Sequence, residues 1–205
     1  MNQDYVVVQQ PSEANRLILL FHGVGDTAAG MAQIGRYFAA ALPQAMVVSI
    51  AGPFSTGYGD GRQWFSVQGV TEENRLSRIE ANLPRFIETV RHWQVQSGVS
   101  AEQTVLVGFS QGSIMSLEAL KSESLLAGHI IAFSGRFAVL PEKAFADVAV
   151  HLIHGEADGV IVVGHAHAAA QRFQELGTSF TLDVAPAVGH GIDEQMLKQA
   201  LAYLK

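Results

Sequence analysis

The chain has 205 residues, of which 48% are hydrophobic and 16% are charged, and this composition is typical of a folded globular protein. Its net charge of −6 offers no basic surface to nucleic acid, and the absence of cysteine excludes disulfides, thiolate metal sites and cysteine nucleophiles. No apolar run approaches the roughly 18 residues of a membrane-spanning helix, and Met1 to Asp4 do not open a signal peptide. We therefore expect a cytoplasmic protein without stable membrane association.

Strand-like and helix-like segments alternate along the whole chain. The expected strands span residues 5–9, 16–21, 46–50, 104–107, 129–134, 148–154 and 179–184. The expected helices span residues 28–42, 71–96, 114–120, 164–176 and 193–204, and Pro84 should kink or split the second of them. This alternation predicts a doubly wound α/β fold, with a mostly parallel central sheet flanked by helices on both faces, in a single domain over residues 1–205.

The segment Gly108-Phe109-Ser110-Gln111-Gly112 joins an apolar strand to an amphipathic helix. A nucleophile elbow requires this context, because the serine sits at a strained apex and bulky residues two positions away would collide with the strand and helix. In a chain with 20 glycines the five-residue pattern alone carries little weight, so its placement and its partners decide the matter. We predict that Ser110 is a catalytic nucleophile.

A serine nucleophile needs a base, and the base needs an orienting carboxylate. In this architecture the chain order is serine, acid, histidine, and Asp158 and His190 each follow an expected strand in that order. Loops beyond the carboxyl ends of parallel strands are where α/β sheets collect functional residues. We predict Asp158 and His190 as the partners, with Glu156 as the nearest substitute acid and Asp183 and Asp193 as weaker ones. The alternative for Asp158 is a plain turn residue.

An oxyanion hole needs two backbone N–H groups. One is expected from Gln111 at the start of the helix, and the other from Val24 in the glycine-containing loop after the strand 16–21.

The same loop also fits the start of a dinucleotide fingerprint, Gly23-x-Gly25-x-x-Ala28. That motif expects an acidic residue about 20 positions later, and residues 43–54 contain none. The histidine pairs 151/154 and 165/167 are spaced so that their side chains point in different directions. We expect no cofactor and no metal.

Residues 51–70 form a long loop rich in glycine and aromatic residues, and connections of this length in compact domains are often functional. We expect Trp64 and Phe65 to offer an apolar wall to substrate. The alternative is that they plug the core beneath the loop.

Taken together, these segments resemble the phospholipase/carboxylesterase family of acyl-protein-thioesterase-like α/β hydrolases. The matching segments are Leu20-Phe21-His22-Gly23-Val24-Gly25-Asp26, Gly108-Phe109-Ser110-Gln111-Gly112, His154-Gly155-x-x-Asp158 and Gly189-His190-Gly191. The resemblance implies an α/β-hydrolase fold without a large lid domain, no cofactor, and cleavage of carboxylic esters.

For the site, the resemblance implies a catalytic triad of Ser110, Asp158 and His190. It also implies oxyanion donors at Val24 and Gln111, with Trp64 bordering the acyl pocket.

Three functions follow from these observations. The first is a serine carboxylesterase that hydrolyses short- to medium-chain esters through an acyl-serine intermediate. The second is an acyl-protein thioesterase or lysophospholipase acting on longer acyl chains, and the third is a non-catalytic binding module. The expected partner is a small-molecule ester, and the sequence leaves open whether the chain is a monomer or a homodimer.

Overall fold

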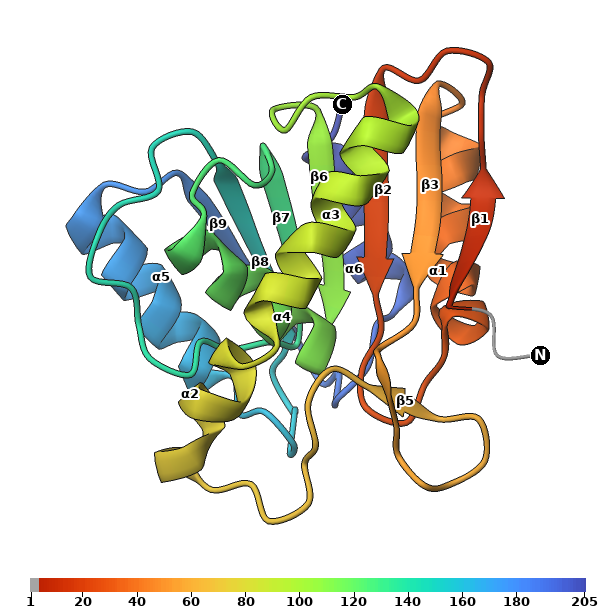
Figure 1. The fold of residues 1–205 in the computed structure, drawn as a ribbon. Coiled ribbons are helices and arrows are strands. Elements are labelled where there is room, and N and C mark those ends of the chain that lie inside the picture. Colours follow the sequence, from red (N-terminus) through yellow and green to blue (C-terminus); the bar gives the residue numbers. More distant parts are fainter. Residues whose placement is uncertain (1–3) are drawn as a thin grey trace.

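A computed structural model describes residues 4–205, and residues 1–3, part of the segment considered for a signal peptide, lie outside the described residues. A seven-stranded sheet runs through the molecule (Figure 1), and every neighbouring pair is parallel except β1 with β3. In order across the sheet the strands are β1 (Tyr5–Gln9), β3 (Ala45–Ile50), β2 (Arg16–Phe21), β6 (Thr104–Phe109), β7 (His129–Phe133), β8 (Ala149–Gly155) and β9 (Phe180–Ala185). The predicted, mostly parallel α/β sheet is confirmed.

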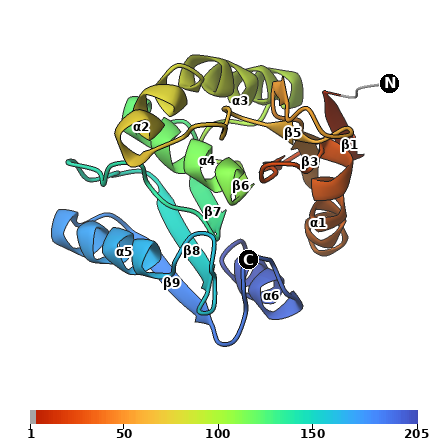
Figure 2. The same cartoon turned by 90° about the horizontal axis from the view of Figure 1, so that it is seen from below.

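Helices cover both faces of the sheet, as Figure 2 shows. On one face lie α1 (Ala28–Ala41) and α6 (Glu194–Ala202). On the other lie α3 (Leu83–Ser97), α4 (Gln111–Ser122) and α5 (Gly164–Leu176), with α2 (Glu72–Glu80) beside α3.

The sequence of β2 explains why both faces must be covered. Leu17 and Leu19 join the core beneath α3, α4 and α5, while Ile18 and Leu20 join the core beneath α1 and α6. All four side chains are fully buried. A strand whose alternating side chains are all apolar is stable only between two layers of helices.

The expected helix over residues 71–96 is two helices, α2 and α3, separated by Ala81 and Asn82. Pro84 lies in the first turn of α3, where its missing N–H would have had no helical partner. The proline therefore splits the segment, as the sequence predicted. Gly98, with a φ of 68°, ends α3 in the left-handed conformation that glycine adopts without strain.

The long loop after β3 contains a small two-stranded antiparallel sheet, made of β4 (Phe54–Ser55) and β5 (Arg62–Gln63). Strands of two residues have no periodicity for sequence analysis to detect. The parallel strands of the main sheet end at the lower edge in Figure 1, and this loop and α2 lie at that edge. Within residues 4–205, no helix has the length and apolar character needed to cross a membrane.

A cluster of polar aromatic side chains lies away from this edge, between the β7–β9 strands and the C-terminal helix. The rings of His151 and Tyr203 are stacked, with 4.3 Å between their centroids. The Nε2 of His151 lies 3.2 Å from the Nδ1 of His129. The Nδ1 of His151 lies 3.0 Å from the Thr181 hydroxyl. Burial, together with the neighbouring His129, lowers the pKa of His151 to about 4.

This cluster predicts a pH-dependent loss of stability. His151 in the unfolded chain has a pKa of about 6.5. Between that pH and about 4, His151 is protonated in the unfolded state and neutral in the folded state. The free energy of unfolding should therefore fall as the pH drops from about 6.5 to about 4. His151→Gln should reduce this fall by about 1–2 kcal/mol, allowing for solvent screening, as measured by urea unfolding at several pH values. His92→Gln, at an exposed position, is the matched control, and an unchanged pH dependence in His151→Gln would contradict the prediction.

Candidate active site

Ser110 lies in the sharp turn between β6 and α4. Its φ of 52° and ψ of −114° place a non-glycine residue in a strained conformation, of the kind that folded proteins keep at functional sites. The turn is tight, so a Cβ on Gly112 would overlap the carbonyl oxygen of Phe21, and a Cβ on Gly108 would overlap the backbone of Ser113. The two glycines are therefore required by close backbone approach, as the elbow motif predicts.

Gly112→Ala should consequently destabilise the fold severely. The added methyl group meets backbone atoms of β2, which cannot move aside as a flexible side chain can. We expect a loss of about 3 kcal/mol or more in the free energy of unfolding. Gly164→Ala is the matched control, because no heavy atom of residues 4–205 lies within 4 Å of a Cβ at Gly164 and its φ is not positive. Thermal unfolding of both variants tests this, and similar melting temperatures would refute it.

The structure brings Ser110, His190 and Asp158 together, although they are far apart in sequence. His190 Nε2 lies 2.9 Å from Ser110 Oγ, and His190 Nδ1 lies 2.7 Å from Asp158 Oδ2. Asp158 follows β8 and His190 follows β9, at the edge of the sheet where β6 also ends. These contacts form the geometry of a serine–histidine–carboxylate triad.

Two backbone hydrogen bonds to Oδ1 orient the carboxylate of Asp158. Oδ1 accepts hydrogen bonds of 2.9 Å from the backbone N–H groups of Val160 and Ile161, which leaves Oδ2 for His190. Burial alone would raise the pKa of Asp158, but the hydrogen bonds from His190 and from the two amides lower it below its usual range. Asp158 is therefore ionised, and His190 donates its Nδ1 proton to it.

The other acids considered from the sequence occupy different places. Glu156 is exposed, Asp183 accepts a hydrogen bond from the hydroxyl of Tyr203, and Asp193 caps α6 by accepting from the N–H of Met196. None of these three contacts His190 among the described hydrogen bonds and ion pairs of residues 4–205.

His154 supports the triad, a role that sequence analysis did not assign. Its Nε2 donates to the carbonyl oxygen of Ile161 at 2.7 Å and lies 3.4 Å from Asp158 Oδ2. Burial lowers the pKa of His154, so its ring is neutral and holds the loop that carries Asp158. Sequence analysis included His154 in a segment that matches the family, but a histidine at the end of an apolar strand does not by itself indicate this role.

The two residues expected to supply the backbone donors of an oxyanion hole line the same cavity as Ser110. They are Val24 and the N-terminal residue of α4, Gln111. Over residues 4–205, neither amide donates a hydrogen bond within the protein. Unpaired N–H groups in the cavity of a nucleophile can stabilise a developing negative charge.

Side chains beneath the site fix the loop that carries Val24. His22 accepts a 2.9 Å hydrogen bond from the N–H of Gly52 through Nε2, and its Nδ1 donates to the carbonyl oxygen of Gly23 at 2.6 Å. Trp64 Nε1 donates to the carbonyl oxygen of His22 at 2.9 Å.

The side chain of Gln111 continues this network. Its Oε1 accepts from the N–H of Trp64, and its Nε2 donates to the carbonyl oxygen of Phe65. We call the five residues His22, Gly52, Trp64, Phe65 and Gln111 the latch, because their hydrogen bonds join the Val24 loop, the long loop and α4.

A cavity of about 430 Å³ opens at Ser110. Apolar side chains line much of it, namely Phe65, Val67, Ile114, Val160 and Ile161. Of the two aromatic residues expected at the substrate, Phe65 lines this cavity and Trp64 does not.

Trp64 is only 4% exposed, packs against Phe21 and Phe86, and lines a separate cavity of about 310 Å³ next to α3. Trp64 therefore packs in the core beneath the loop, which was the alternative considered from the sequence. Its indole N–H is part of the latch, because it donates to the carbonyl oxygen of His22. The sequence could not decide between a substrate wall and a core plug for each residue, because the direction of a side chain in a loop depends on the path of the loop.

Polar residues that sequence analysis missed also line the Ser110 cavity. Arg75 comes from α2, Arg136 from the loop after β7, and His165 from the first turn of α5. They lie on three elements and belong to no motif, so no signal in the sequence links them.

A doubly wound sheet with a serine elbow, a histidine and a carboxylate at the carboxyl ends of its strands defines the α/β hydrolases. This chain belongs to the phospholipase/carboxylesterase family, whose sequence model matches residues 2–205. The predicted fold and the predicted family are both confirmed.

Individual relatives agree with this membership. The chain is 51% identical over its whole length to the esterase YpfH of Escherichia coli strain K12, covering 89% of that protein. It is 27% identical to acyl-protein thioesterase 1 of Eremothecium gossypii, over 97% of this chain and 91% of that protein. The crystal structure of esterase PE8 superposes with a TM-score of 0.84 at 28% identity, covering 94% of this chain and 92% of that one.

Proposed function

We propose that this protein is a serine carboxylesterase that hydrolyses short- to medium-chain carboxylic esters through an acyl-serine intermediate. The observation that carries the proposal is the continuous hydrogen-bonded chain from Ser110 Oγ through His190 to Asp158. The amides of Val24 and Gln111, which donate no hydrogen bond over residues 4–205 and belong to the Ser110 cavity, support the same reaction class, as do the esterases of the family.

In the proposed mechanism, Ser110 Oγ attacks the ester carbonyl carbon while His190 Nε2 takes the hydroxyl proton. The carbonyl oxygen becomes negatively charged and receives hydrogen bonds from the amides of Val24 and Gln111. Asp158 holds the ring with its Nδ1 protonated and stabilises the imidazolium that forms. Collapse of the intermediate breaks the bond to the alcohol oxygen, which leaves with the proton from His190.

A water molecule then repeats the sequence on the acyl-serine. His190 takes a proton from water, the resulting hydroxide attacks the acyl carbon, and the acid leaves as the proton returns to Ser110. Each residue ends in the state in which it began.

The size of the cavity favours the short- to medium-chain reading over the alternative, hydrolysis of long acyl chains on proteins or lysophospholipids. A cavity of about 430 Å³ is within the range of small-molecule sites and must also hold the ester group and the alcohol. Relatives named acyl-protein thioesterase make the long-chain reading the specific alternative.

Purified protein assayed against p-nitrophenyl esters from acetate to palmitate tests the proposal. We expect kcat/KM to be highest among the short and medium chains and to fall towards palmitate. A maximum at the longest chains would replace the first reading with the second. No hydrolysis at any length, together with no labelling of Ser110 by a fluorophosphonate, would favour the non-catalytic module.

The same proposal includes a cytoplasmic enzyme made of one domain over residues 1–205, acting as a monomer or a homodimer. Cell fractionation, limited proteolysis and analytical ultracentrifugation test these three points separately.

A further inference from the structure

Two cationic side chains line the cavity at Ser110, in a protein that is negatively charged overall. The chain carries a net charge of −6, yet the described residues that line this cavity include Arg75 and Arg136 and no aspartate or glutamate. His165 lies beside them. An ester made only of apolar groups gains nothing from these cations.

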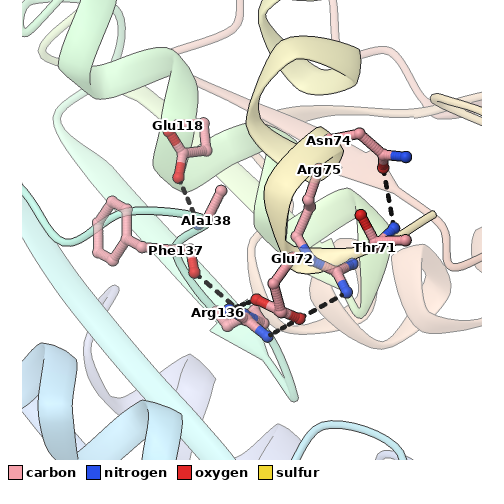
Figure 3. A network of polar contacts seen from close by, with 8 residues as sticks. All are labelled: Thr71, Glu72, Asn74, Arg75, Glu118, Arg136, Phe137 and Ala138. Atoms are coloured by element: carbon pink, nitrogen blue, oxygen red, sulfur yellow. Dashed lines mark hydrogen bonds and ion pairs between the residues drawn. The ribbon is translucent and has the colours of Figure 1, made fainter.

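The two guanidinium groups meet at a single carboxylate, that of Glu72, as Figure 3 shows. Arg136 binds it with both terminal nitrogens, Nη1 to Oε1 at 3.2 Å and Nη2 to Oε2 at 2.8 Å. Arg75, one turn further along α2, donates from Nη2 to Oε1 at 3.0 Å. One negative charge therefore faces two positive charges.

The burial of the three side chains is unequal. Glu72 is 61% exposed, whereas Arg75 is 20% exposed and Arg136 is 13% exposed. The carboxylate thus faces solvent and the two cations face the protein. The cluster therefore lacks one negative charge.

We propose that Arg75 and Arg136 form a subsite for a carboxylate group on the ester substrate. Arginine suits this task because its planar donors match the two oxygens of a carboxylate. The inference rests on the proposed esterase function, since it names the class of ester that the Ser110 site prefers. The substrate is then an ester of a dicarboxylic acid or of a carboxylated alcohol, with its reacting carbonyl at Ser110 and its free carboxylate at the two arginines.

The subsite lies in the same cavity as the nucleophile, so selectivity between matched esters measures it. For an acyl-side carboxylate, we compare mono-p-nitrophenyl adipate with its methyl ester. For an alcohol-side carboxylate, we compare 4-acetoxybenzoate with methyl 4-acetoxybenzoate. We expect the charged member of at least one pair to have a kcat/KM about 10-fold higher, as a charge-assisted pair at a partly exposed site would give.

Three variants separate a charge effect from a structural one. Arg75→Gln should lower the charged-to-neutral ratio of kcat/KM about 10-fold, and Glu72→Gln should raise it, because the competing carboxylate is gone. Opposite movements cannot come from general damage to the cavity. Arg36→Gln, an exposed change of the same charge on α1, should leave the ratio unchanged. A ratio that is equal in wild type, Arg75→Gln and Glu72→Gln for both ester pairs would overturn the inference.

A binding measurement keeps the test independent of catalysis. Adipate dianion should raise the melting temperature of the Ser110→Ala protein, and the rise should disappear in Ser110→Ala/Arg75→Gln. If the wild-type protein hydrolyses neutral esters but neither prefers nor binds the carboxylate, the subsite is refuted and the esterase function stands. If no ester is hydrolysed but adipate binding depends on Arg75, the esterase function fails and the carboxylate site stands.

Discussion

Ser110→Ala is expected to lower kcat for p-nitrophenyl butyrate by about 10⁵–10⁶-fold, because the attacking oxygen is removed and no acyl-enzyme can form. The fold should survive, since alanine tolerates the positive φ at this position about as well as serine. Far-UV circular dichroism and the melting temperature should match those of the wild type. The steady-state rate of p-nitrophenolate release measures the loss of kcat.

Ser116→Ala is the matched control for this variant. Ser116 lies on α4, the helix that Ser110 precedes, and is fully buried, and among the described hydrogen bonds its hydroxyl donates to the carbonyl oxygen of Gly112 in the same helix. It should keep most of the activity and retain labelling by a fluorophosphonate, which Ser110→Ala should lose. Near-normal turnover by Ser110→Ala would end the assignment of the nucleophile.

Asp158→Asn should lower kcat by about 10⁴-fold, although the side chain hardly changes in size. The amides of Val160 and Ile161 donate to Oδ1, so the carbonyl oxygen of an asparagine would take that place. Its NH₂ group would then face His190 Nδ1 and require that nitrogen to accept. The ring proton would move to Nε2, which faces Ser110. A protonated Nε2 cannot accept the proton of the serine hydroxyl.

Asp183→Asn is the control for Asp158→Asn, because Asp183 is also in the β8–β9 region but binds Tyr203 rather than the triad. It should retain wild-type kcat. Equal activity losses in the two variants would show that the effect is structural, and an active Asp158→Asn protein would remove Asp158 from the triad. Nitrogen-15 chemical shifts of the His190 ring would report the expected change of tautomer directly.

The triad could be predicted from the sequence because each member follows a strand of a parallel sheet. Apolar runs locate β6, β8 and β9, and the sheet itself brings their carboxyl ends to one edge. Ser110, Asp158 and His190 therefore needed no knowledge of side-chain packing to be proposed together.

The surroundings of the triad could not be predicted in this way. The direction of Trp64 depends on the path of a long loop, and the contacts of His22 and His154 depend on backbone atoms of distant segments. Arg75 and Arg136 are single charged residues on an exposed helix and a loop, a pattern that most often indicates a solvated surface. Their common position in the cavity accompanies the ion pair that joins Glu72 on α2 to Arg136 in the loop after β7, a contact that no sequence period encodes.

The latch has a consequence for how the enzyme meets its substrate. Its hydrogen bonds join protein groups to one another and fix the Val24 loop, so we expect the proposed oxyanion hole to form without movement of this loop when an ester binds. Such a site gains nothing from adsorption to a droplet or micelle, and the rate should follow the concentration of dissolved ester smoothly through the solubility limit. We therefore expect the enzyme to act on monomeric esters dissolved in water, without interfacial activation.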